Sequence, residues 1–337
     1  MTDKDIVLSV KDLNVNFYTN KRVNKVLRGV SFDVKKGTTL GIVGESGSGK
    51  SVSAKSIMGL LPELSRIESG SISYYKGEKE VKIENLNRKG QEMRDLRGKE
   101  IAMIFQDPMT ALNPVYTIGY QIREMINEHL DLSKDEVEKL TIQSLKNVGI
   151  SDVGRRLNEY PHQFSGGMRQ RAMIAMAMSC SPRLLIADEP TTALDVTISA
   201  QIFELMNDLK ERTNTAIILI THDMGVIAEM ADEVAVMYVG NIVEKGDVRD
   251  LFKNPAHPYT KALLKSIPVL GKGKDQNLQP IKGSTPNPYN RPKGCQFAPR
   301  CDFATEKCHE EMPEEYFLDN NHMTRCFNYK EVLDSGR

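Results

Sequence analysis

The spacing of apolar residues predicts a chain in which strands alternate with helices. Val30, Phe32 and Val34 occupy every second position, as in a half-buried strand. Short apolar runs of the buried-strand type follow, at residues 39–43, 101–105, 184–187, 216–220 and 234–238. Helical patterns separate several of these runs, for example at residues 50–61 and 197–211. This alternation predicts βαβ units around a parallel sheet, and therefore an α/β fold.

Two regions depart from the alternation. Residues 6–34 contain strand patterns without helices, which predicts a small antiparallel β subdomain. Residues 118–178 carry almost only helical patterns, which predicts a helical subdomain at about 107–180.

A change of composition near Ser266 predicts a domain boundary. Residues 268–294 are rich in Pro, Gly, Lys and Asn, which is typical of an irregular connection. Four of the five cysteines lie beyond it. We therefore expect a first domain over residues 1–265 and a small Cys-rich C-terminal domain over residues 266–337.

The composition is that of an ordinary globular protein. The chain has 337 residues, of which 40% are hydrophobic and 27% charged, and this length predicts about two domains. Lys+Arg and Asp+Glu both number 45, and a zero net charge argues against nucleic acid as a partner. No apolar run approaches the ~18 residues that span a bilayer, and the first residues lack a signal-peptide pattern. We expect a cytoplasmic protein that meets a membrane only through a partner.

A glycine-rich motif follows the strand predicted at residues 39–43. Residues 44–51 have the sequence Gly-Glu-Ser-Gly-Ser-Gly-Lys-Ser, which fits the phosphate-binding pattern G-x-x-x-x-G-K-[ST]. The glycines let backbone N–H groups approach phosphate, and the helix that follows adds a partial positive charge. The lysine reaches the β- and γ-phosphates, and the final serine ligates Mg²⁺. The residues expected to bind ATP or GTP with Mg²⁺ are Gly44, Ser46, Gly47, Gly49, Lys50 and Ser51.

Two carboxylates end the apolar run at residues 184–187. Asp188 and Glu189 would be costly to bury there unless a cation or a partner meets them. We expect Asp188 to hold Mg²⁺ through water and Glu189 to act as the general base on the water that attacks the γ-phosphate. The alternative for Glu189 is that it only caps the following turn.

A second glycine motif precedes a predicted helix. Ser165 is suited to cap this helix, and the N–H groups of Gly166 and Gly167 can bind phosphate. Taken alone, the motif could equally be an ordinary glycine turn before a helix.

The order of these motifs resembles the ATP-binding cassette (ABC) family. The resemblance covers roughly residues 6–265 and rests on residues 44–51, 164–170, 184–190 and 220–223. It implies a P-loop (RecA-like) ATPase core with an antiparallel β subdomain and a helical subdomain. It also implies that ATP is hydrolysed between two facing subunits.

The resemblance assigns further roles. Ser165, Gly166 and Gly167 are implied to contact the ATP held by the opposite subunit, although this chain has Phe164 where Leu is usual and Met168 where Gln is usual. The other implied roles are contact with Mg²⁺ and the attacking water for Gln106, γ-phosphate sensing for His222, contact across the dimer interface for Asp195, and adenine stacking for Phe17, with Tyr18 second.

Three segments of the sequence make the resemblance more specific. They are similar to the corresponding segments of bacterial dipeptide and oligopeptide importers. They lie at residues 106–114, 160–171 and 257–260, and the cysteine-containing extension is also similar to that group. Nickel and glutathione importers belong to the same group and remain open. The implied partners are a second ATPase subunit, identical or different, two membrane permease subunits and, indirectly, an extracytoplasmic peptide-binding protein. The implied location is the cytoplasmic face of the membrane.

Three other classes of protein fit less well. ATPases of DNA repair insert a coiled coil or zinc module between the first two motifs, whereas residues 52–164 have no sustained heptads and no cysteine. Translation ATPases fuse two cassettes, and one is present here. A metal- or redox-sensing module would not need the intact catalytic set.

Four thiols close together predict a metal site in the C-terminal region. A cytoplasmic chain does not usually keep structural disulfides, and four thiolates suit zinc or an iron–sulfur cluster. No C-x₂₋₄-C pair occurs, so a [4Fe-4S] cluster is favoured over Zn²⁺. Arg300 and Arg325 could offset the negative charge of the site, His309 ranks below the thiols as a ligand, and Cys180 is expected to be a plain buried thiol. The expected ligands are Cys295, Cys301, Cys308 and Cys326.

Overall fold

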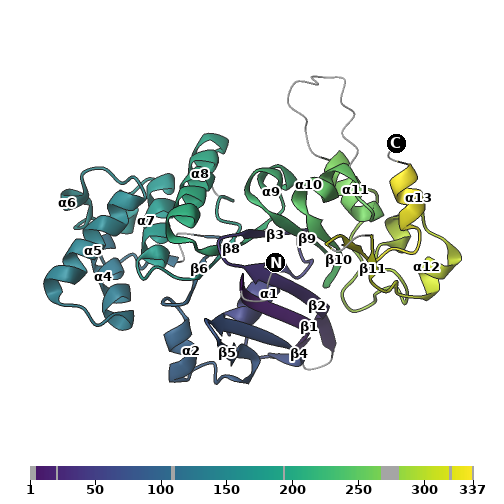
Figure 1. Ribbon diagram of the computed structural model, residues 1–337, viewed down its shortest axis with the longest axis horizontal. Coiled ribbons are helices and arrows are strands. Elements are labelled where there is room, and N and C mark those ends of the chain that lie inside the picture. Colours follow the sequence, from purple (N-terminus) through teal and green to yellow (C-terminus); the bar gives the residue numbers. More distant parts are fainter. Residues whose placement is uncertain are drawn as a thin grey trace. The chain divides into compact units, whose positions relative to one another are not determined.

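The computed structural model describes residues 5–19, 22–107, 111–192, 194–266, 281–318 and 321–335. The chain divides into two compact units (Figure 1). Unit 1 consists of Met1–Leu8, Val34–Thr38 and Tyr74–Leu219. Unit 2 consists of Ser9–Asp33, Thr39–Ser73 and Ile220–Arg337.

Unit 1 is built on short, fully buried strands. β6 (Ile101–Ile104) and β7 (Leu184–Asp188) pair in parallel, and β8 (Ala216–Thr221) lies next to β7. All the residues of these strands are buried, as expected for a parallel sheet whose two faces are both covered. The predicted strands at 101–105, 184–187 and 216–220 are therefore confirmed to within one residue at each end.

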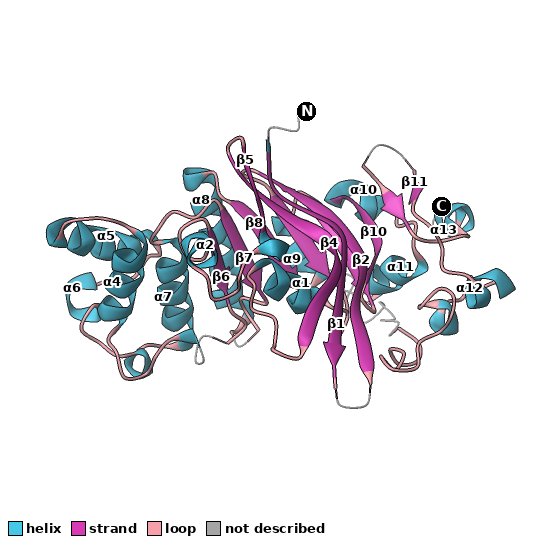
Figure 2. Cartoon of the chain, turned by 90° about the horizontal axis from the view of Figure 1, so that it is seen from below, coloured by secondary structure: helices cyan, strands magenta, loops and turns pink. Residues whose placement is uncertain are grey.

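The helices of unit 1 follow the expected pattern. The region predicted to be helical contains α4 to α7, which lie together in both ribbon views (Figures 1 and 2). Ser133 and Glu136 form a capping box at the start of α5, which satisfies backbone N–H groups that the helix leaves unpaired. The remaining elements of this unit are β5 (Lys79–Lys82), α2 (Gln91–Leu96), α4 (Ile118–His129), α5 (Lys134–Asn147), α6 (Val153–Arg156), α7 (Gly166–Met178) and α8 (Val196–Thr213).

Unit 2 contains two sheets. In one, the long strand β1 (Ile6–Tyr18), which begins in unit 1, lies between β2 (Val23–Lys35) and β4 (Ser65–Lys76), as Figure 2 shows. In the other, β3 (Thr39–Val43) pairs in parallel with β9 (Glu233–Tyr238). The helices of unit 2 are α1 (Lys50–Ile57), α9 (Met224–Met230), α10 (Val248–Lys253), α11 (Pro258–Lys265), α12 (Glu306–Glu310) and α13 (Tyr329–Asp334).

Helix α1 ends earlier than its pattern predicts. The expected helix at residues 50–61 stops at Ile57. Gly59 has a left-handed backbone (φ 59°), and the N–H of Leu60 reaches back to the carbonyl of Lys55 at 2.8 Å. This is the usual glycine-based helix end, in which a residue after the helix bonds to a carbonyl of its last turn.

The C-terminal region joins the second sheet of unit 2. β10 (Asn241–Asp247) runs antiparallel to β9, and β12 (Met323–Thr324) pairs antiparallel with β10 and with β11 (Tyr316–Phe317). Residues on both sides of the boundary predicted near 265 therefore share a sheet. Nearly half of the predicted connection, residues 268–280, lies outside the described residues, and the boundary stays a prediction.

Aromatic packing strengthens this connection. Phe297 packs edge-to-face on Tyr238 at 5.3 Å between ring centroids, and lies 5.4 Å from the ring of Tyr259. All three residues belong to the same buried cluster as Val43, the last residue of β3. The hydrophobic core beneath the glycine-rich loop thus includes a residue of the C-terminal region.

We therefore predict that Phe297→Ala destabilises unit 2 by roughly 3–5 kcal/mol, since it removes a buried aromatic ring. Phe317→Ala is the matched control, because Phe317 lies in the same region and is 64% exposed; it is expected to change stability by less than about 0.5 kcal/mol. Urea denaturation followed by intrinsic fluorescence measures both. Equal small effects would show that the C-terminal region does not contribute to the core of unit 2.

Candidate nucleotide-binding site

The glycine-rich loop lies in unit 2, between β3 and α1. It leaves the sheet at Gly44, where a side chain would meet the carbonyl oxygen of Met237 at 2.1 Å, so only glycine fits. Lys50, the first residue of α1, turns its ammonium back into the loop and donates to the carbonyls of Gly44 (2.7 Å) and Glu45 (3.1 Å). Ser46 and Gly47, at the tip, are exposed. The strand–loop–helix context required by the motif is thus present.

Glu45 is held by residues far away in the sequence. Its N–H donates to the hydroxyl of Tyr259 at 2.8 Å. Its carboxylate accepts two hydrogen bonds from the guanidinium of Arg300, at 2.6 Å from Nη1 and 3.0 Å from Nη2. The Arg300 side chain is only 4% exposed, and the bonds from Glu45 raise its pKa above the ordinary arginine value. No local pattern in the sequence predicts either contact.

The paired carboxylates lie in unit 1, at the carboxyl end of β7. Asp188 is buried, whereas Glu189 is half-buried and has a left-handed backbone (φ 47°). Non-glycine residues in this conformation cost about 1–3 kcal/mol and concentrate at functional sites. Glu189 Oε2 accepts hydrogen bonds from Gln106 Nε2 (3.0 Å) and from Thr192 Oγ1 (2.9 Å). The structure therefore brings Gln106 and Glu189 together, and it adds Thr192, which the sequence did not single out.

Two helix N-termini of unit 1 carry the other predicted residues. Ser165 caps α7, as predicted, and its hydroxyl accepts from the N–H of Met168 at 3.3 Å. Gly166 and Gly167 form the first turn, and Gly166 is exposed together with Ser165. Asp195 is exposed and caps α8 by accepting from the N–H of Ile198 at 2.9 Å.

Three more predicted residues belong to unit 2. His222 is exposed and follows β8 directly. Phe17 is half-buried near the end of β1. Tyr18, the alternative aromatic, donates its hydroxyl to Glu68 at 2.5 Å and has the guanidinium of Arg66 over its ring.

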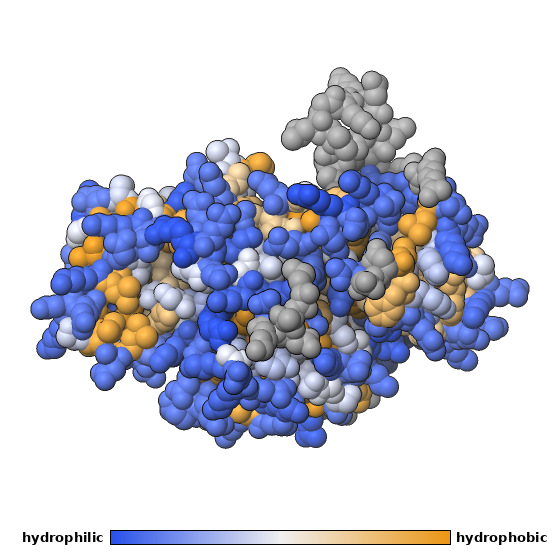
Figure 3. Space-filling model, viewed as in Figure 1, coloured by the Kyte–Doolittle hydropathy of each residue, from blue (hydrophilic) through white to orange (hydrophobic). Residues whose placement is uncertain are grey.

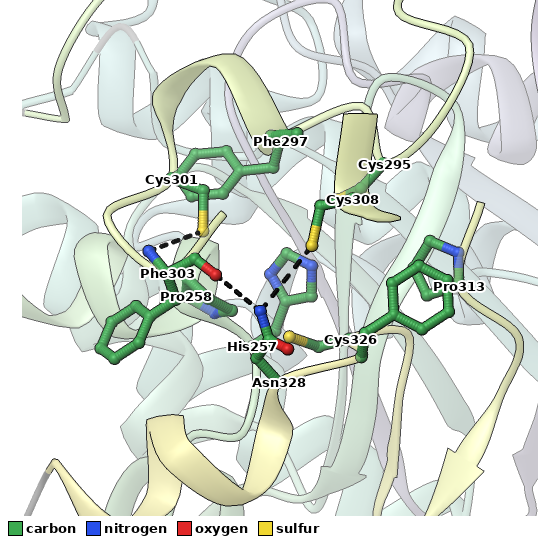
Figure 4. Close-up of a pocket in the computed structure, with 12 residues that line it drawn as sticks. His257, Pro258, Cys295, Phe297, Cys301, Phe303, Cys308, Pro313, Cys326 and Asn328 are labelled. Carbon is green, nitrogen blue, oxygen red and sulfur yellow. Dashed lines mark hydrogen bonds between the residues drawn. The ribbon is translucent and has the colours of Figure 1, made fainter. Parts of the chain in front are cut away.

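The four C-terminal cysteines line one cavity in unit 2 (Figure 4). Cys308 belongs to α12, the other three lie in loops, and the cavity wall also includes His257. Burial raises the pKa of Cys301 and of Cys326 to about 12, with a smaller contribution from the neighbouring thiols. Without a metal these groups are therefore neutral thiols. The cysteines are Cys295, Cys301, Cys308 and Cys326.

The predicted metal site is not supported by the arrangement of these thiols. Within the described ranges, no group of three or more His, Cys, Asp or Glu side chains is placed to hold a metal ion. His309, the reserve ligand, is exposed and does not line the cavity. Cys180 is a plain buried thiol, as predicted.

The two arginines expected to balance the negative charge of the metal site pair with carboxylates instead. Arg300 pairs with Glu45, as described above, and Arg325 donates to Glu315 at 2.8 Å. Neither guanidinium is therefore available as a spare positive charge for the cavity, and this part of the expectation is wrong.

Comparison with known proteins identifies the family. The family model "ABC transporter" matches residues 27–192, and the model "Oligopeptide/dipeptide transporter, C-terminal region" matches residues 243–308. A probable peptide ABC transporter ATP-binding protein of Sinorhizobium fredii is 49% identical over 98% of this chain and 97% of its own length. A dipeptide transport ATP-binding protein of Bacillus subtilis is 50% identical over 95% of this chain and 94% of its own.

The chain belongs to the ABC transporter family. Solved structures agree: a dimeric ATP-binding cassette bound to ADP and phosphate in a post-hydrolysis state superposes with a TM-score of 0.62 at 26% identity, covering 72% of this chain and 99% of that one. A cassette of an ABC transporter complex from Clostridium perfringens also gives a TM-score of 0.62, at 27% identity, covering 74% of this chain and 91% of that one. The α/β fold of unit 1 and unit 2 is thus that of an ABC ATPase cassette, and the chain is an ATPase.

The two family models divide the site residues of this ABC subunit. The first spans the glycine-rich loop, Gln106, Ser165 and the Asp188–Glu189 pair. The second spans three of the four cavity cysteines and ends at Cys308, so Cys326 lies beyond it. In the part of the chain that the structure describes, no helix is long and apolar enough to cross a bilayer. The face drawn in Figure 3 is accordingly mostly hydrophilic, with scattered apolar patches.

Proposed function

We propose that this ABC subunit hydrolyses ATP to power the import of dipeptides and oligopeptides through a membrane transporter. The observation that carries the proposal is the near full-length similarity, at about half identity, to peptide and dipeptide transport ATP-binding proteins. The match of residues 243–308 to the C-terminal model of that group supports it. Uptake of nickel or glutathione by the same mechanism is the alternative.

The proposed work of unit 2 is to hold the nucleotide. Lys50 moves from the carbonyls of Gly44 and Glu45 to the β- and γ-phosphates, and the loop N–H groups surround the phosphate chain. Ser51 ligates Mg²⁺, whose charge offsets that of the phosphates. Phe17 stacks on adenine and His222 contacts the γ-phosphate. The exposed tip of the loop, with Lys50 already turned toward it, supports this assignment.

The proposed work of unit 1 is to activate water. Asp188 holds Mg²⁺ through water, and Gln106 contacts both the ion and the attacking water. Glu189 accepts the proton of that water as general base. The hydrogen bonds of Gln106 and Thr192 to Oε2 of Glu189 support this role, because they hold the carboxylate in one orientation.

A second ATPase subunit completes each site in this proposal. Ser165, Gly166, Gly167 and Asp195 would contact the ATP bound to the facing subunit, so that ATP joins the pair. The exposed N-terminus of α7 supports this, since N–H groups at a helix N-terminus can donate to a phosphate from outside the chain. Two permease subunits anchor the pair at the cytoplasmic face of the membrane, and a peptide-binding protein delivers the substrate outside.

The C-terminal cysteines are proposed to hold a [4Fe-4S] cluster, with Zn²⁺ as the alternative. The chemistry of the donor set supports this: four thiols line one cavity, and none of the twelve residues described as lining it is a carboxylate. A bound cluster or ion would supply order to a region poor in large apolar residues.

Glu189→Gln should retain ATP binding and lose turnover by about 10²–10⁴-fold, since it removes the general base and keeps the hydrogen-bonding shape. Lys50→Ala is the contrasting variant and should weaken ATP binding itself, because a charge-assisted contact to phosphate is lost. ATP affinity by titration calorimetry and phosphate release by a coupled assay separate the two. Turnover at the parent rate in Glu189→Gln would remove Glu189 from the base role.

ATP should drive association of the subunit. With Glu189→Gln to prevent hydrolysis, light scattering is expected to report a monomer without nucleotide and a dimer with Mg²⁺ and ATP, because each ATP needs Lys50 of one subunit and Ser165 of the other. Ser165→Arg, which fills the α7 N-terminus, should leave ATP affinity unchanged and abolish the dimer. A dimer that forms equally without ATP would contradict the composite site.

Anaerobically purified protein should contain about four iron and four sulfide per chain and show a broad absorbance that bleaches with dithionite. Cys301→Ser should lose this signal, and Cys180→Ser, which changes a buried thiol outside the cavity, should keep it. A colourless protein with one zinc per chain would decide for the alternative metal, and one with no metal would refute both.

A further inference from the structure

The contact between Arg300 and Glu45 joins the C-terminal region to the phosphate loop. The two residues are 255 positions apart, and both belong to unit 2. The guanidinium meets the carboxylate with two nearly parallel hydrogen bonds, at 2.6 and 3.0 Å. This bidentate arrangement fixes the angle between the two groups as well as their distance.

Every polar group of the Glu45 main chain is engaged as well. Its carbonyl accepts from Lys50 Nζ at 3.1 Å and from the N–H of Ser48 at 3.2 Å, and its own N–H donates to Tyr259. The position of Glu45 therefore determines where the carbonyl oxygens of the loop lie relative to the Lys50 ammonium. A change in the Arg300 contact must be transmitted to the lysine that is proposed to bind phosphate.

Arg300 itself is rigidly supported. It ends a 3₁₀ turn (Ala298–Arg300), and its Nε donates to the carbonyl of Lys282 at 2.8 Å. Its guanidinium donates to the hydroxyl of Tyr238 at 3.2 Å and lies 5.8 Å from the ring centroids of Tyr238 and Phe297. A charge held this deeply must keep its carboxylate, because a lone buried charge is strongly unfavourable.

A second arginine of the C-terminal region supports the other side of the loop. Arg291 donates from Nη1 to the carbonyl of Val239 at 2.9 Å. Val239 and Gly240 form the tight turn between β9 and β10, both with left-handed backbones. The N–H of Gly240 in turn donates to the carbonyl of Ser48 at 2.8 Å. One direct contact, from Arg300, and one contact relayed through the turn at Val239 and Gly240 thus connect residues 291–300 with residues 45–48.

We propose that Arg300 is a positioning residue for ATP binding: through Glu45 it holds the phosphate loop in the shape that accepts phosphate. The C-terminal region then acts as a brace that raises the ATP affinity of the cassette. Arg300 need not touch the nucleotide. The inference rests on the proposed role of residues 44–51 in holding phosphate.

The decisive measurement is the ATP dissociation constant of the full chain with Mg²⁺. Arg300→Met, which keeps the length of the stem and removes the charge, should weaken ATP binding roughly 5- to 20-fold, a typical coupling between sites. Arg300→Lys should recover little, since an ammonium cannot make the bidentate contact. Arg325→Met is the matched control: this arginine also precedes a cavity cysteine and pairs with a carboxylate, Glu315, but outside the loop, and its effect should be less than about 2-fold.

The double variant Glu45→Gln with Arg300→Met separates positioning from folding. It leaves no buried charge unpaired, so it should fold, and its ATP affinity should equal that of Arg300→Met alone rather than show a further loss. An additive further loss would mean that the two residues act separately and would overturn the proposal.

Thermodynamic linkage between ATP binding and the Arg300 contact supplies a second measurement. Its result would not change if Arg300 only stabilised the fold. If Arg300 raises ATP affinity, then ATP must equally stabilise the Arg300 contact. Hydrogen exchange of residues 295–301 should slow when ATP binds to the parent protein, and it should be insensitive to ATP in the double variant Glu45→Gln with Arg300→Met. Exchange that ignores ATP in the parent would overturn the proposal.

The variant Lys50→Ala shows whether a negative result refutes only the role of Arg300 or also the phosphate-binding role of the loop. If Lys50→Ala weakens ATP binding and Arg300→Met does not, then the loop binds phosphate and the brace is refuted. If neither variant weakens ATP binding, the assignment of the phosphate loop fails first, and the brace fails with it.

Discussion

The loop between β3 and α1 must present backbone N–H groups to a ligand while its own carbonyl oxygens remain satisfied. The ammonium of Lys50 resolves this conflict, because it donates to the carbonyls of Gly44 and Glu45 from inside the loop. The surrounding structure keeps that arrangement in place. Tyr259 and Arg300 hold Glu45, and the turn at Gly240 holds Ser48. The contacts of several distant residues therefore converge on one short segment of main chain, the loop itself.

The local pattern of apolar and polar residues was sufficient to predict much of this structure. The buried strands were predicted because a parallel strand covered on both faces consists of apolar residues throughout. The helix cap at Ser165 was predicted because a serine before two glycines and a helix has one obvious hydrogen-bonding role. The meeting of Gln106 and Glu189 follows from topology, since Gln106 comes two residues after β6 and Glu189 directly after β7, and these strands pair in parallel.

What the sequence did not reveal depends on contacts between distant segments. Nothing in the local sequence around Arg300 indicates Glu45, and the nearby cysteines suggested a different use for its charge. The end of α1 at Ile57 was missed because the apolar pattern continues past the glycine that stops the helix. The four cysteines, expected to form a metal site, line one cavity, but their spacing in the sequence carries no information on how closely the sulfur atoms approach a common centre.

The pairing of Arg300 with Glu45 has a consequence for evolution and for protein engineering. A C-terminal region exchanged between two transporters would bring its own arginine, or another residue, to a loop whose partner carboxylate lies in the other parent. Residue 45 is a variable position of the glycine-rich motif, so the motif itself does not guarantee a match. A chimaera joined after α11 therefore keeps this contact only when its residue 45 is a carboxylate and its tail carries the arginine.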